Sequence, residues 1–138
     1  MIAYIDSSVI LRVVLGQPDR LREWKSLSLG VASALVEVEC LRTLDRLKIR
    51  EKIADAAIAD RRQAVFRLVE EMELVEPTRP VLTRASQPLP TPLGTLDAIH
   101  LATALLWREK ERKELIMATH DTALGVAARA CGLRVVGI

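Results

Sequence analysis

Residues 2–16, IAYIDSSVILRVVLG, carry the pattern of a strand that turns directly into a helix. The four residues IAYI form a short β-type run, and the following Asp-Ser-Ser supplies the side chains that favour a helix start. The apolar helical pattern then ends at Gly16, with Pro18 just beyond it. This strand-to-helix unit is the repeating element of parallel α/β folds.

The same alternation continues to the end of the chain. We expect further strands at 73–77, 115–119 and 133–138. We expect helices at 19–29, at 33–49 with Ser33 as N-cap, at 50–72, after Pro80, at 95–113, and at 121–132 ending at Gly132. Three prolines make 87–92 a loop. The sequence therefore predicts an α/β fold in three layers, in which helices cover both faces of a mainly parallel sheet of about four or five strands.

Size and composition indicate one globular domain, residues 1–138, with an aliphatic core. Half of the 138 residues are apolar, 28% are charged and only 3% are aromatic. The net charge of +2 gives no argument for nucleic-acid binding by itself. Two cysteines without metal-ligand spacing, no signal peptide and no apolar run near the ~20 residues of a membrane span predict a cytoplasmic protein.

Acidic residues stand at unusual places in this pattern. Asp6 follows the first strand and Asp121 follows the strand at 115–119, so both belong to the edge where open α/β sheets bind ligands. Asp97 shares an otherwise apolar helix face with His100, and Glu39 lies on a helix that must bury much of its surface. An unpaired carboxylate in such a setting is costly and needs a partner.

Each acid also has an ordinary structural explanation. Asp6 and Asp121 can serve as helix N-caps, and Asp97 as a first-turn acid favoured by the helix dipole. Glu39 can pair with Arg42 three residues later on the surface. Taken together, however, four acids that converge at one end of a sheet repel one another, and a divalent cation removes that repulsion. Oxygen ligands suit Mg²⁺ or Mn²⁺ rather than zinc, and such an ion can activate water for phosphodiester hydrolysis.

The chain resembles the PIN domain family, in particular the small VapC-type toxins of VapBC toxin–antitoxin pairs. The resemblance lies in YIDSSVIL, SALVEVECLR, LDAIHLATAL and ATHDTALGVAARACGLRVV, in the family's order. It implies a PIN-like fold with four site acids, Asp6, Glu39, Asp97 and Asp121. Glu39 fits better than Glu37 because an arginine stands three residues after Glu39 only.

The resemblance also implies residue roles and an activity. Asp6 and Asp97, joined by Asp121, would hold Mg²⁺ (or Mn²⁺), and Glu39 would bind it through water or orient the attacking water. Ser8 and Thr119 are expected to support the acids or touch phosphate, and Arg42 either meets the RNA backbone or pairs with Glu39. The implied activity is an endoribonuclease that leaves a 5′-phosphate and a 3′-hydroxyl.

The implied partners are RNA, a small antitoxin and a second copy of the chain. The antitoxin's C-terminal tail would lie over the cleft, in a groove lined by the apolar helices 8–29 and 33–72. A homodimer is common among relatives, and the mean hydropathy of +0.19 leaves apolar surface for it.

Two other functions remain open at the level of sequence. One is a PIN-fold nuclease that processes RNA or cuts DNA with flaps, and the other is a non-catalytic PIN-like interaction module. A nucleotide-binding protein is disfavoured because no glycine-rich phosphate loop follows the first strand. His100 is expected to be a hydrogen-bonded core histidine, His120 to be exposed, and Trp24 and Trp107 to be packing residues.

Overall fold

A five-stranded, fully parallel sheet forms the centre of the molecule. The computed structural model describes residues 1–138. The strands are β1 (Ile2–Ile5), β2 (Leu29–Ser33), β3 (Glu73–Val75), β4 (Ile116–Ala118) and β5 (Arg134–Val136). They lie side by side in the order β3-β2-β1-β4-β5, and every pairing is parallel. The predicted α/β class and the predicted parallel sheet are confirmed.

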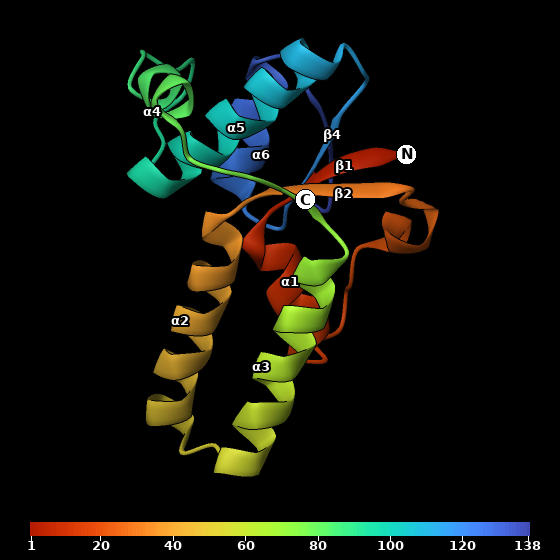
Figure 1. The fold of residues 1–138 in the computed structure, drawn as a ribbon, viewed down its shortest axis with the longest axis vertical. Coiled ribbons are helices and arrows are strands. Elements are labelled where there is room, and N and C mark those ends of the chain that lie inside the picture. The colour runs from red at the N-terminus through yellow and green to blue at the C-terminus, as the bar shows by residue number, and fades with distance from the viewer.

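Helices cover both faces of this sheet. They are α1 (Ser7–Val14), the 3-10 helix η1 (Arg22–Ser26), α2 (Leu35–Glu51), α3 (Asp55–Glu70), α4 (Arg79–Ala85), α5 (Thr95–Glu111) and α6 (Thr122–Ala130). In Figure 1, α1, α2 and α3 lie on one side of the strands, and α4, α5 and α6 lie on the other. No helix is both long enough and apolar enough to cross a lipid bilayer.

The central strand β1 divides the core into two halves. Ala3 and Ile5 are fully buried against the side chains of α1, α2 and α3. Tyr4, between them, is fully buried on the other face among side chains of α5 and α6. Because successive side chains of a strand point to opposite faces, this short run anchors both helical layers.

The stretch around residues 19–33 corrects two sequence predictions. The helix predicted at 19–29 is only the 3-10 turn η1, and residues 29–33 form strand β2. Ser33 ends this strand and is not the N-cap of α2, although its hydroxyl accepts the Leu35 N–H at 3.2 Å. The sequence LGVAS is weakly β-forming, but β2 is hydrogen-bonded to β1 on one side and β3 on the other. Pairing with two neighbours therefore overrides the local preference.

Candidate functional site

Asp6 lies at the carboxyl end of β1, and its side chain is only 4% exposed. It occupies the N-cap position of α1 but makes no side-chain capping bond. Instead, Asp6 Oδ2 accepts hydrogen bonds from Ser8 Oγ at 2.6 Å and Thr119 Oγ1 at 2.9 Å. The capping explanation is therefore wrong for the Asp6 carboxylate, which is held in place by two hydroxyl groups.

Asp121 follows the neighbouring strand β4 and does cap a helix. Its Oδ1 accepts the Leu124 N–H at 2.9 Å, so one oxygen is used at the start of α6 and the other is left for a second partner. The Asp121 N–H in turn donates to Thr119 Oγ1 at 3.0 Å. Thr119 thus touches both acids, and it is completely buried.

Ser8 and His120 extend this network. The His120 N–H donates to Ser8 Oγ at 2.9 Å, and the His120 ring shares a 2.8 Å hydrogen bond between Nδ1 and the Gly137 carbonyl. His120 Nε2 is shielded and has no hydrogen-bond partner. The prediction that His120 is exposed is therefore wrong for its ring, which is half-buried. Ser8 and Thr119 lie beside the acids, as the sequence predicted.

Glu39 is tied to the core by a buried histidine. His100 Nε2 forms a short hydrogen bond with Glu39 Oε1, and His100 Nδ1 lies 2.6 Å from the Tyr4 hydroxyl. The Tyr4 oxygen also accepts the Ser33 N–H at 3.1 Å. His100 is fully buried and hydrogen-bonded, which confirms the sequence prediction. Tyr4 was missed, although a lone tyrosine in an otherwise aliphatic central strand is a signal that its hydroxyl needs a buried partner.

Burial and the neighbouring acids have opposite effects on the pKa of His100. Burial by itself lowers the pKa of His100, but the hydrogen bond and charge of Glu39, aided by Asp6 and Asp97, raise that pKa overall. A protonated His100 ring donates from both nitrogens, so it fixes the Glu39 carboxylate and compensates its charge.

Asp97 lies on the first turn of α5 and shares the electrostatic field of the other acids. Burial raises the pKa of Asp97, and the charges of Asp121, Asp6 and Glu39 raise it further. Such coupling requires short distances, because charges in a wet protein surface interact weakly beyond a Debye length of about 10 Å. The fold therefore brings Asp97 within electrostatic reach of three acids that lie far from it in the sequence.

The donor chemistry at this edge fits a hard divalent cation. The negative charges that raise the pKa of Asp97 are offset when a cation lies among them. No three His, Cys, Asp or Glu side chains lie close enough together to ligate one ion. This spacing is compatible with Mg²⁺, which takes one or two protein carboxylates and keeps several waters.

Arg42 does not pair with Glu39. Its Nη1 lies 3.1 Å from Asp45 Oδ2 in an exposed ion pair, so the pairing considered from the sequence is wrong. Such exposed pairs contribute little to stability. The partner of Glu39 is instead the buried His100 ring.

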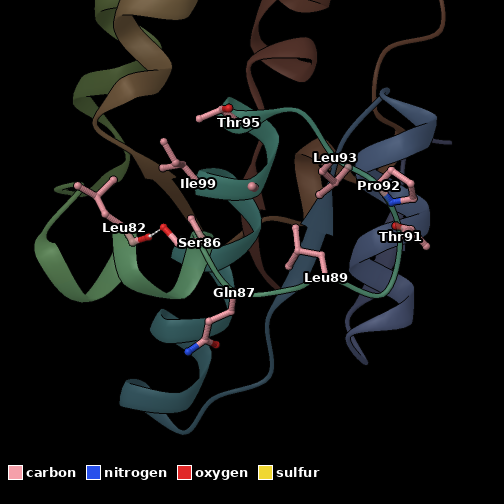
Figure 2. A pocket seen from close by; sticks show the side chains of 11 residues that line it. Leu82, Ser86, Gln87, Leu89, Thr91, Pro92, Leu93, Thr95 and Ile99 are labelled. Carbon is pink, nitrogen blue, oxygen red and sulfur yellow. Dashed lines mark hydrogen bonds between the residues drawn. The ribbon is translucent and has the colours of Figure 1, made fainter.

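A pocket of about 480 Å³, lined by none of the four acids, lies between α4, the proline-rich loop and the start of α5. Figure 2 shows Leu82 on α4 and Ser86 directly after this helix, joined by the hydrogen bond from Ser86 Oγ to the Leu82 carbonyl, and Leu89 and Leu93 on the loop. Its lining contains no ionisable side chain. A smaller pocket of about 300 Å³ does include Glu39, together with arginines of α2.

The sequence matches the PIN domain family over residues 3–130. It is 34% identical over 138 residues to Ribonuclease VapC46 of Mycobacterium tuberculosis, a match that covers 96% of this chain and 95% of the relative. Two solved structures have a similar fold. FitAB bound to a DNA fragment has a TM-score of 0.68 and 18% identity, and the match covers 98% of this chain and 93% of the other. A toxin–antitoxin complex from Klebsiella pneumoniae has a TM-score of 0.61 and 16% identity, and the match covers 88% of this chain and 86% of the other. The chain belongs to the PIN domain family.

Proposed function

We propose that this chain is a Mg²⁺-dependent endoribonuclease and the toxin of a VapBC-type toxin–antitoxin pair. The observation that carries the proposal is that Asp6 and Asp121 follow the adjacent parallel strands β1 and β4, at the carboxyl edge of the sheet, where their charges and that of Glu39 act on Asp97. Membership of the PIN family and the similarity to a protein named as a ribonuclease support the same activity. Mn²⁺ is expected to replace Mg²⁺ because both prefer oxygen ligands.

We assign the metal to Asp6, Asp97 and Asp121, of which one or two would bind Mg²⁺ directly and the rest through water, with Glu39 in an outer position. Asp6 accepts hydroxyl hydrogen bonds through Oδ2, which leaves Oδ1 for the ion. Asp121 uses Oδ1 for capping, which leaves Oδ2. Bound Mg²⁺ would lower the pKa of water and offset the charge that develops on the phosphoryl oxygens.

The side chains of this chain position the reactants. Glu39, which is held by His100, would orient the attacking water and accept a hydrogen bond from it. Ser8 and Thr119 keep the Asp6 carboxylate from rotating, which preserves the geometry that an in-line attack requires. Because His100 and Tyr4 are buried, bulk water would not reach the side of Glu39 that contacts His100.

We propose three further features of the biology. A small antitoxin would inhibit the enzyme by laying a segment over the acids, a partnership supported by the similarity to a solved toxin–antitoxin complex. A homodimer is supported by exposed apolar side chains such as Ile49 (77% exposed) and Phe66 (39%). We place the enzyme in the cytoplasm, where its RNA substrate and its antitoxin would be found.

The test is a cleavage assay with the purified full chain. Single-stranded RNA, structured RNA and flap DNA are incubated with Mg²⁺, with Mn²⁺ and with EDTA. We expect metal-dependent RNA cleavage that Asp6→Asn abolishes, whereas Asp60→Asn on the outer face of α3 serves as the matched control and leaves it intact. Cleavage confined to DNA, or RNA cleavage that survives both EDTA and Asp6→Asn, would refute the proposal.

A further inference from the structure

The pocket that contains Glu39 is formed by residues of three helices, α1, α2 and α5. Residues of α2 form one wall, and Ser7 at the start of α1 and Leu96 in the first turn of α5 form the others. Its volume of about 300 Å³ is at the lower end of the range for small-molecule sites. Because Glu39 is part of its lining, anything bound in this pocket lies directly beside the proposed reaction centre.

One side of the pocket is apolar although it faces water. Val38 is 50% exposed and directly precedes Glu39 in the chain. Leu96 is 49% exposed and directly precedes Asp97. Large aliphatic side chains that are exposed next to each other are typical of surfaces that a ligand covers and shields from water. The flat face of a nucleobase is a ligand of that kind.

Beyond Val38, the wall of the pocket that α2 forms is basic. Val38, Arg42 and Arg46 follow one another at intervals of four residues, so they form one stripe along α2. Arg42 is already paired with Asp45, but Arg46 bonds only the Thr43 hydroxyl, at 3.1 Å. The guanidinium of Arg46 therefore has no carboxylate partner and keeps donors free for an anion.

The distances suit an RNA strand that leaves the acid site along α2. Arg46 lies seven residues beyond Glu39, which is about 10 Å along a helix. Glu39 does not neutralise the arginines, because it is bound to His100 on the core side. A strand can thus place its scissile phosphodiester at the acids and the next phosphate at the arginines.

We propose that this pocket binds one unpaired nucleotide beside the scissile bond, with its base against Val38 and Leu96 and its phosphate on Arg46. The inference rests on the proposed nuclease function and names the residues that would hold the nucleotide next to the scissile bond. A paired base is stacked in a duplex and cannot enter such a pocket, whereas an unpaired base can be turned out and buried.

The test measures RNA affinity and cleavage separately in one set of variants. Affinity for a labelled single-stranded RNA is measured by fluorescence anisotropy with Ca²⁺ in place of Mg²⁺, at several salt concentrations. Cleavage with Mg²⁺ gives kcat and KM. The variants are Arg46→Ala, Arg46→Lys and Val38→Ser, and Arg50→Ala on the same helix but outside the pocket is the matched control.

For Arg46→Ala we expect about tenfold weaker binding of single-stranded RNA and a salt slope reduced by about 0.7. KM should rise while kcat stays within about twofold, Arg46→Lys should recover part of the loss, and Val38→Ser should weaken binding without changing the salt slope. Arg50→Ala should behave as the wild type, and all variants should keep the wild-type circular dichroism spectrum.

Three results would overturn the inference. The first is wild-type affinity in both Arg46→Ala and Val38→Ser. The second is an equal loss in Arg50→Ala, which would indicate a diffuse charge effect. The third is unchanged RNA binding by the Arg46 and Val38 variants together with weakened binding of a cognate antitoxin, which would indicate that the pocket binds the antitoxin. A wild-type chain that binds single-stranded RNA through Arg46 but cleaves none would refute the proposed function and leave this inference standing.

Discussion

Replacing Tyr4 with phenylalanine should destabilise the protein far more than the loss of one hydroxyl usually does. The Tyr4 oxygen is the partner of both the Ser33 N–H and His100 Nδ1, and all three residues are fully buried. Phenylalanine keeps the ring but leaves two buried polar groups unpaired. Each costs about 1–3 kcal/mol, so we expect the free energy of unfolding to fall by about 2–6 kcal/mol.

Urea denaturation followed by tryptophan fluorescence measures this change. With an m-value of about 2 kcal/mol/M, the midpoint should fall by about 1–3 M while m stays constant. Ser86→Ala is the control, because it also removes one hydroxyl hydrogen bond, at an exposed position. Its effect should stay within about 0.5 kcal/mol. A Tyr4→Phe effect no larger than the control would refute the reasoning that the hydroxyl is the required partner of two buried groups.

The same substitution should alter catalysis in a specific way. Tyr4 touches neither substrate nor metal in our account, but it positions His100, which holds Glu39. We therefore expect Tyr4→Phe to lower kcat about tenfold at a temperature where the variant is folded, with KM unchanged. A change confined to KM would place Glu39 in substrate binding and not in the reaction step.

Three further predictions follow from the site. Asp97→Asn should abolish RNA cleavage, yet it should raise the thermal midpoint of the protein in EDTA, because a half-buried charge that neighbouring acids repel is removed. A lowered midpoint would contradict this. The raised pKa of His100 means that its contribution to stability is complete below its ordinary value of 6.5 and is lost as pH rises through the raised pKa. Urea midpoints of the metal-free protein between about pH 6 and 9 should show this fall, and His100→Gln should lack it. Gly137→Ala should cost about 2–5 kcal/mol, because φ is +102° and a Cβ would lie 2.4 Å from the Thr119 carbonyl, whereas Gly16→Ala, in open space at φ +63°, should cost about 1 kcal/mol by the same denaturation assay.

Much of the architecture was predictable because its signals are local. The run at residues 2–5 and the capping residues after it mark β1 and α1, and the proline-rich loop separates α4 from α5. Strand β2 was missed because LGVAS contains glycine and small side chains, and its structure depends on pairing with two neighbours. Its neighbour β1 shows the opposite case, since it is predictable from its own four residues.

Only those parts of the candidate site that follow from the topology of the sheet were predictable. Asp6 and Asp121 follow strands that are adjacent and parallel, so the prediction that both lie at the same edge of the sheet is confirmed. The partner of Glu39 was not predictable. His100 lies 61 residues away in the chain, and the sequence pattern of α2 does not determine which other helix Glu39 faces. The metal, its ligands and the catalytic roles remain predictions.

Diffraction from a crystal soaked in Mn²⁺ tests the central claim most directly. The anomalous signal locates the ion without any assumption about its ligands. We predict one dominant peak between Asp6, Asp97 and Asp121, at a Mn²⁺ concentration that supports RNA cleavage. A dominant peak elsewhere on the protein, or no peak at these carboxylates at that concentration, would contradict the account.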